Sequence, residues 1–254
     1  ITTTALGLTL QWPGDVMLSD CDRDPAQAIP AGYLRGLDLG GRGLATLARL
    51  HREARDFSPD LLGQTVPLTE NDSSARRFLP GFAQPGAVRL FDHIWPELAE
   101  AFETLDAKGM DVIVDAGRLG REGLPVALLE VADAIGFVLQ SNLKSLAASR
   151  LYLPLLVEQV NSLTADRPLG LLITGPDRPY SAREITAQFG VSCWAQIPWA
   201  PQPAGVLSHG LTPPRRFRSS PLLSSYRATA LDLTQQLERD KGLRRKLLLG
   251  EGAP

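Results

Sequence analysis

Short apolar runs alternate along the chain with segments whose apolar residues recur at helical spacing. The runs that predict buried strands lie at 15–20, 111–117, 134–141, 169–175 and 191–199, and a shorter one is expected within 75–82. Unbroken apolar strands separated by helices are typical of a parallel sheet covered on both faces. The pattern therefore predicts a doubly wound α/β fold of three layers, with a mostly parallel sheet flanked by helices.

The helical segments carry start and stop signals of different strength. Helices are expected at 1–10, 43–54, 92–109, 142–163, 180–190 and 221–240. The segment 180–190 has a capping box, with Ser181 as N-cap and Glu184 three residues later, and Gly190 closes it. Pro154 predicts a break or kink in the helix at 142–163. The stretch 198–221 is rich in proline and is expected to form a loop.

The chain shows no internal repeat, and its length suits one large domain or two small ones. We expect a single domain over residues 1–240, truncated at its N-terminus, and a basic, leucine-rich tail over 241–254.

Composition limits the classes of function. With 26 basic and 28 acidic residues the net charge is −2, so any basic surface must be local. No apolar run is long enough to span a bilayer, and no signal peptide is visible. Two cysteines, Cys21 and Cys193, are too few and too far apart to indicate a disulfide framework or a metal site. A cytoplasmic protein is expected.

Acidic residues follow two of the predicted strands, and hydroxyl residues open the first helix. Asp20 and Asp22 end or follow the run at 15–20, Asp115 ends "VIVDAG", and three threonines begin the first helix. Strand-end carboxylates together with hydroxyls at a helix N-terminus suit a magnesium–nucleotide site. Each feature also has a simpler interpretation, since aspartates commonly form turns and threonines commonly cap helices.

At these residues the sequence resembles the ParA/MinD ATPases, P-loop NTPases with a deviant Walker A motif. The blocks that carry the resemblance are "ITTTALGL", "VMLSDCDRDP" and "DVIVDAGRL", followed by "LGLLITGPDRPYSAREITAQFGVSCWAQIPW". They match, in order, the end of the glycine-rich loop, a strand ending D-x-D-P, the Walker B strand, and a late strand–helix–strand unit ending in I-P. The resemblance extends from Thr2 to about residue 240 and implies a ParA/MinD-type fold.

The resemblance also implies roles for individual residues. Thr2 would bind Mg²⁺ through its hydroxyl, Thr3 would contact phosphate, Asp20 would hold a magnesium-bound water, and Asp115 is the Walker B acid. The activity implied is ATP hydrolysis, with ATP and Mg²⁺ as cofactors, in a switch that forms a homodimer on ATP. Chromosome partitioning and cell division are the processes in which such ATPases position DNA or a division or secretion assembly.

Two further roles follow from the resemblance, and the sequence departs from the family's pattern in three ways. Asp22 would orient the attacking water as the catalytic residue, and Pro198 would lie near the adenine. The sequence resembles a divergent member, because the first strand and the glycine loop are not within it and Ile1 stands where the P-loop lysine is expected. The family's adenine-reading asparagine is replaced within "ITGPDR". A pseudo-ATPase scaffold that keeps the fold for protein–protein interaction therefore stays open as an alternative.

Two basic segments suggest partners. The first, "PPRRFRSSP", places Arg215, Arg216 and Arg218 in one loop, which indicates either non-specific DNA binding or an ordinary solvated loop. The second, "KGLRRKLLLG" near the C-terminus, has an imperfect amphipathic pattern and suggests weak membrane contact or a frayed helix end. The sequence does not identify a protein partner.

Overall fold

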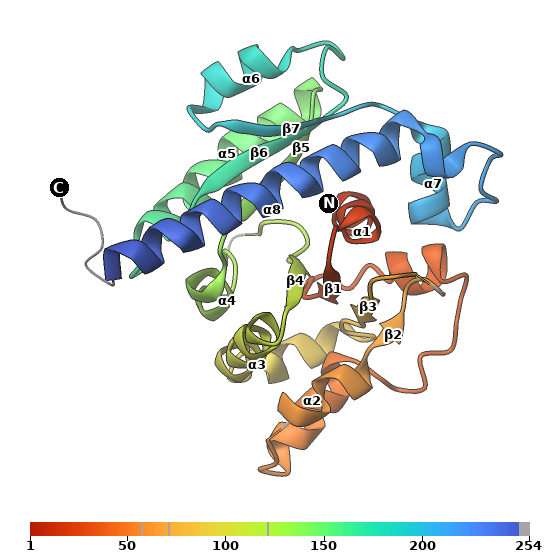
Figure 1. The fold of residues 1–254 in the computed structure, drawn as a ribbon, viewed down its shortest axis with the longest axis vertical. Coiled ribbons are helices and arrows are strands. Elements are labelled where there is room, and N and C mark those ends of the chain that lie inside the picture. Colours follow the sequence, from red (N-terminus) through yellow and green to blue (C-terminus); the bar gives the residue numbers. More distant parts are fainter. Residues whose placement is uncertain (57, 71, 121, 249–254) are drawn as a thin grey trace.

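In the computed structural model, helices and strands alternate along most of the chain (Figure 1). The structure describes residues 1–56, 58–70, 72–120 and 122–248, apart from the side chains at 85, 86, 90 and 242–248. The strands are β1 (Asp15–Asp20), β2 (Val66–Pro67), β3 (Arg76–Leu79), β4 (Met110–Asp115), β5 (Ile135–Gln140), β6 (Leu169–Thr174) and β7 (Cys193–Ile197). The α-helices are α1 (Thr2–Gln11), α2 (Leu44–Arg52), α3 (Trp95–Ala107), α4 (Val126–Val131), α5 (Leu143–Asn161), α6 (Ala182–Phe189), α7 (Pro201–His209) and α8 (Pro221–Leu248). The helical turns η1 (Ala28–Tyr33), η2 (Ser58–Gln64), η3 (Pro85–Phe91) and η4 (Phe217–Ser219) lie in the connections.

The described strands form two sheets. One has the order β2-β3-β1-β4 and the other the order β5-β6-β7. Every pairing is parallel except the short antiparallel pair of β2 and β3. The predicted mostly parallel α/β architecture is confirmed, although the strands are divided between two sheets.

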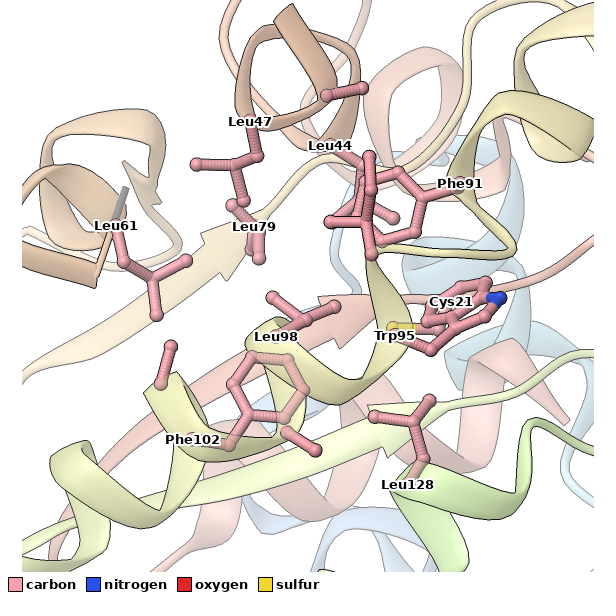
Figure 2. Close-up of a cluster of buried hydrophobic side chains, with 14 of the residues drawn as sticks. Cys21, Leu44, Leu47, Leu61, Leu79, Phe91, Trp95, Leu98, Phe102 and Leu128 are labelled. Carbon is pink, nitrogen blue, oxygen red and sulfur yellow. The ribbon is translucent and has the colours of Figure 1, made fainter. Parts of the chain in front are cut away.

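Helices cover both faces of these sheets. The helices α1, α7 and α8 share one apolar cluster with residues of both sheets, among them Leu18 of β1 and Ile197 of β7. The opposite face of the first sheet packs on α2 and α3, and the opposite face of the second packs on α5 and α6. Figure 2 shows the cluster beneath α2 and α3, where Phe91 and Trp95 lie edge to face with ring centroids 4.7 Å apart.

Local signals fix several helix ends as the sequence predicts. The capping box of α6 is present, since the Ser181 hydroxyl accepts from the Glu184 N–H and the Glu184 carboxylate accepts from the Ser181 N–H. Gly190 ends the helix in the left-handed conformation at φ +67°. The break predicted at Pro154 does not occur, because α5 continues through this residue to Asn161.

Three local expectations are corrected. The proline-rich stretch 198–221 is not only a loop, because it contains α7 and η4. Proline is tolerated at the start of α7 because first-turn N–H groups lack helical acceptors in any case. The short helix α4 was not expected. The threonines of α1 do not cap it through their side chains, since the N-cap is Ile1 and no side-chain cap bond forms.

The C-terminal segment begins as a helix. Residues 241–248 continue α8, while 249–254 and the side chains of Arg244, Arg245 and Lys246 lie outside the described part of the chain. Just before them, the Lys241 ammonium donates to Asp106 of α3 and lies 3.1 Å from a carboxylate oxygen of Asp133. Lys241 thereby ties this part of α8 to the end of α3 and the start of β5.

Candidate functional site

The site is built around two carboxylates at the ends of neighbouring strands. Asp20 of β1 and Asp115 of β4 are direct partners in the parallel register. Both are buried, with exposed fractions of 8% and 1%. The strands are apolar and parallel, so their carboxyl ends meet at one edge of the sheet, where α/β proteins bind their ligands.

Burial and like charge act together on Asp20. Desolvation, followed by the nearby Asp115 carboxylate, raises the pKa of Asp20 from 3.8 to about 7. The Asp22 N–H donates to its Oδ1 at 3.2 Å and opposes the shift. Two buried carboxylates held side by side favour binding of a proton or a cation.

Asp115 has an unused acceptor. Its Oδ1 accepts from the Gly117 N–H at 3.0 Å, while its Oδ2 is buried and has no hydrogen-bond partner. A buried carboxylate oxygen without a partner is costly. A donor or a metal-bound water placed there would satisfy it, which is the type of contact expected of a Walker B acid.

Asp22 lies against the turn that follows β4. A Cβ on Gly117 would be only 2.0 Å from Asp22 Oδ1, and Gly117 has φ +68°. The same oxygen accepts from the Asp24 N–H at 2.9 Å. Desolvation is the main cause of the raised pKa of Asp22, and Asp115 adds to it. Glycine is required here for both its conformation and the close approach.

The N-terminus of α1 reaches this group of carboxylates. The backbone nitrogen of Ile1 lies near Asp115 and Asp22. The N–H groups of Thr4 and Ala5 both donate to the Ile1 carbonyl, so those of Thr2 and Thr3 have no acceptor within the helix. Free N–H groups at a helix N-terminus favour a bound anion such as phosphate. Thr2 and Thr3 are thus well placed for the predicted roles, and no described contact tests those roles.

Arg118 is a further charged residue of this region, which sequence reasoning missed. Its guanidinium lies near the start of α1 and acts electrostatically on Asp22, whose pKa it lowers. The signal in the sequence was its position directly after "DAG", in the turn that Gly117 allows. An arginine beside a helix N-terminus supplies positive charge suited to phosphate oxygens.

Pro198 lies at the carboxyl edge of the other sheet. It follows β7 directly, where Gly175 after β6 donates its N–H to the Ile197 carbonyl at 2.7 Å. The Trp199 side chain is 47% exposed beside Gly175. No described contact joins Pro198 to the carboxylates, so its role near an adenine stays a prediction.

Whether this site suits a magnesium ion depends on which side chains it offers as ligands. Among the described residues, no three His, Cys, Asp or Glu side chains form a group able to hold a metal by themselves. In a nucleotide site Mg²⁺ needs fewer protein ligands, because one or two carboxylates together with phosphate and water oxygens complete its coordination shell. Asp20 and Asp115 fit that requirement, and the partnerless Oδ2 of Asp115 is the observation that supports it.

The two basic segments singled out in the sequence are not part of the site around Asp20 and Asp115. Arg215, Arg216 and Arg218 are all exposed on the connection between α7 and α8. None of the helices in the described part of the chain combines the length and apolar character needed to cross a membrane.

Comparisons with known proteins agree on the architecture. No family model and no curated protein sequence matches the chain. Among solved structures, the chain is similar to a ParA family ATPase from Chlorobium tepidum, with 14% identity, 91% of each chain covered and a TM-score of 0.64.

Two other similar structures contain a nucleotide. One is the septum site-determining protein MinD from Pyrococcus horikoshii in complex with Mg-ADP, with 15% identity, a TM-score of 0.61, and 91% of this chain and 88% of that chain covered. The other is a plasmid partition protein from Borrelia burgdorferi bound to AMPPNP, with 13% identity, 92% of each chain covered and a TM-score of 0.57. The chain therefore has the fold of the ParA and MinD ATPases.

Proposed function

We propose that this protein is an ATP-dependent switch that binds Mg-ATP at the carboxyl edge of β1 and β4, hydrolyses it and dimerises on ATP to position a cargo such as DNA or a division or secretion assembly. The observation that carries the proposal is the pairing of Asp20 with Asp115, whose Oδ2 is buried without a partner beside the start of α1. The likeness to solved ParA and MinD structures supports it.

The roles within the proposed site follow from chemistry and position. Thr2, Asp20 and Asp115 would hold Mg²⁺, which when bound neutralises phosphate charge. The free N–H groups at the start of α1, together with Thr3 and Arg118, would bind phosphate oxygens. Asp20 and Asp115 are both buried in a region of low dielectric, where a divalent cation would interact strongly with their ionised carboxylates.

Asp22 has a different role in the proposal. Its carboxylate is fixed by the Asp24 N–H and by the close approach of Gly117. Desolvation raises the pKa of Asp22, and its fixed carboxylate would orient the attacking water. Pro198 would lie against the adenine.

Calorimetric titration of the full-length protein with ATP, with and without Mg²⁺, tests the site. Asp115→Ala should weaken magnesium-dependent binding, whereas Asp22→Ala should keep binding and lose hydrolysis. Asp232→Ala, at an exposed position of α8, is the matched control and should change neither. If millimolar ATP produces neither heat of binding nor a thermal shift, the proposed nucleotide site is wrong and only the fold assignment stands.

A scaffold that keeps the fold without hydrolysis is the second candidate. The observation that favours it is the apolar side chain of Ile1, 45% exposed at the start of α1, where the resemblance expects a lysine. Loss of such a charge-assisted contact would cost on the order of two to three decades in rate. A lysine and glycines encoded upstream of Ile1 would favour the switch, and binding of ATP without turnover would favour the scaffold.

The proposal also includes a binding partner, either DNA or a membrane. We favour non-specific DNA, bound through the exposed Arg215, Arg216 and Arg218. Weak contact of the C-terminal tail with an anionic membrane, strengthened when dimerisation doubles the anchor, is the alternative. Both are consistent with a cytoplasmic protein.

A further inference from the structure

The outward side of α5 is apolar over most of its length. Ten large apolar residues are exposed in the described part of the chain, and three of them, Leu143, Leu151 and Leu155, lie on this helix. Leu143 and Leu151 are each 69% exposed. A single exposed leucine is ordinary on a protein surface, whereas a row of them on one helix is typical of an interface.

The spacing of these residues places them on one face of the helix. Each residue advances about 100° around a helix, so positions four and eight apart stay on the same side. The buried side of α5 packs on the β5-β6-β7 sheet, and the helix lies on the side of that sheet away from α8 (Figure 1). The outward face consists of exposed residues only, at positions 143, 144, 147, 148, 151, 154, 155 and 158.

Opposite charges mark the two ends of this outward face. Lys144 lies near the start of α5 and Glu158 near its end, each seven residues from Leu151. In the part of the chain that the structure describes, neither Lys144 nor Glu158 takes part in an ion pair. Positions seven apart form a seam that runs nearly along the helix axis, as in helix pairs that cross at about 20°.

The charges select the direction in which a second copy of this face would pair with it. A two-fold axis at Leu151, perpendicular to the helix, makes the two helices antiparallel and places Lys144 of each copy opposite Glu158 of the other. A parallel pair would instead place Lys144 opposite Lys144 and Glu158 opposite Glu158. The antiparallel arrangement therefore forms two ion pairs where the parallel one has two repulsions.

Side-chain size is complementary in the same antiparallel arrangement. Ala147 and Ala148 precede the axis, and the larger Pro154 and Leu155 follow it. Residues equally far from the axis on either side meet across the pair, so the two alanines lie at the level of Pro154 and Leu155 of the second copy. Small residues opposite large ones allow two helices to pack closely.

A hollow beside the outward face fits the remaining leucine. It has a volume of about 510 Å³ and lies between α5 and α6, with Leu153, Val157 and Phe189 as its apolar lining. Antiparallel pairing brings Leu143 of the second copy to the level of Glu158, which also lines the hollow. A side chain that is 69% exposed in the single chain would thus gain apolar neighbours.

We propose that the outward face of α5 binds the same face of a second copy of this chain, as an antiparallel helix pair centred on Leu151. The charge pattern, the alternation of small and large residues and the hollow all fit this one occupant. The contact involves neither nucleotide nor the carboxylates at the ends of β1 and β4, so it does not rest on the proposed function. One helix pair buries less surface than an obligate dimer does, so we expect a reversible dimer with a Kd in the micromolar range.

Sedimentation velocity of the full-length protein without nucleotide, from low micromolar to sub-millimolar concentration, tests this proposal. The protein should dimerise reversibly, and Leu151→Glu should raise the Kd by at least about 100-fold, because it places two carboxylates against each other at the axis. Leu231→Glu, at an exposed leucine of α8, is the matched control and should not change the Kd. A protein that stays monomeric, dimerises only with Mg-ATP, or responds equally to both substitutions would overturn the proposal.

Charge reversal tests the antiparallel direction. Lys144→Glu or Glu158→Lys alone places like charges opposite each other twice, so each should raise the Kd on the order of 10-fold. A mixture of the two single variants should form a mixed dimer more tightly than either variant dimerises alone, since both of its pairs are attractive. The double variant Lys144→Glu/Glu158→Lys should dimerise like the parent protein. Single variants that do not recover affinity when mixed or combined would contradict the proposal.

Discussion

Asp20 and Asp115 lie opposite each other at the last paired position of β1 and β4, both buried and both carboxylates. Repulsion between these two carboxylates, when both are ionised and buried, destabilises the protein in the absence of a bound ligand. The paired carboxylates therefore favour binding of a proton or a cation between them, next to the free N–H groups of α1.

The stability of the nucleotide-free protein should fall as the pH rises through the titration of Asp20. The native state keeps a proton on Asp20 up to about pH 7, whereas the unfolded chain releases it near pH 4. Between these values the native state binds more protons, so the free energy of unfolding decreases with rising pH, by about 1.4 kcal/mol per pH unit at most.

Asp20→Asn should flatten this dependence and raise stability at pH 8 relative to the parent protein. Urea unfolding at pH 5 and pH 8 measures the effect. If the difference between the two pH values is the same in both proteins, Asp20 is not the group responsible.

Gly117→Ala should displace Asp22. The new Cβ would lie 2.0 Å from Asp22 Oδ1, and the position has φ +68°, so a loss of stability of about 1–3 kcal/mol is expected. ATP hydrolysis should fall as well if Asp22 orients water. Gly120→Ala, in the same connection but with open space around it, is the control. Similar melting temperatures for the two variants would argue against the close contact.

Gly7→Ala should destabilise the packing of α1 against α8. Alanine normally favours a helix over glycine by about 1 kcal/mol, but here its Cβ would be 2.2 Å from the Tyr226 ring. Tyr226 is 2% exposed and shares a side-chain hydrogen bond with Thr4, so its ring has little room to move. A net loss of about 1–3 kcal/mol is expected in thermal or urea unfolding. Gly63→Ala, at an open position, should have little effect, and a gain in stability for Gly7→Ala would refute the prediction.

The DNA and membrane alternatives separate in one set of binding measurements. Substituting Arg215, Arg216 and Arg218 with alanine should weaken retardation of non-specific DNA and reduce its salt dependence. Truncation after Lys241 should abolish sedimentation with anionic liposomes if the tail is the anchor. Keeping Lys241 preserves its contacts to Asp106 and Asp133. A truncated protein that still sediments with lipid would exclude the tail as anchor.

Local sequence determined much of the secondary structure. Apolar runs predicted every strand that forms the centre of the two sheets, because such runs are stable only when covered on both faces. The capping box at Ser181 and Glu184 fixed the start of α6, since it satisfies backbone donors within four residues of chain. Proline misled the prediction for 201–209, because its cost depends on its position in a helix rather than on its presence.

The sequence also placed three acids at strand ends, but only the tertiary structure decided their relationship. Strand order made Asp20 and Asp115 neighbours, and the φ of Gly117 brought the turn containing Arg118 onto Asp22. Strand order likewise leaves β4 and β5, each paired on one side only among the described residues, on either side of a cavity. The pattern of apolar and polar residues along a chain indicates which residues are buried and which local conformation they adopt. Which distant strands become neighbours depends on how all the apolar faces of the helices and strands are buried together.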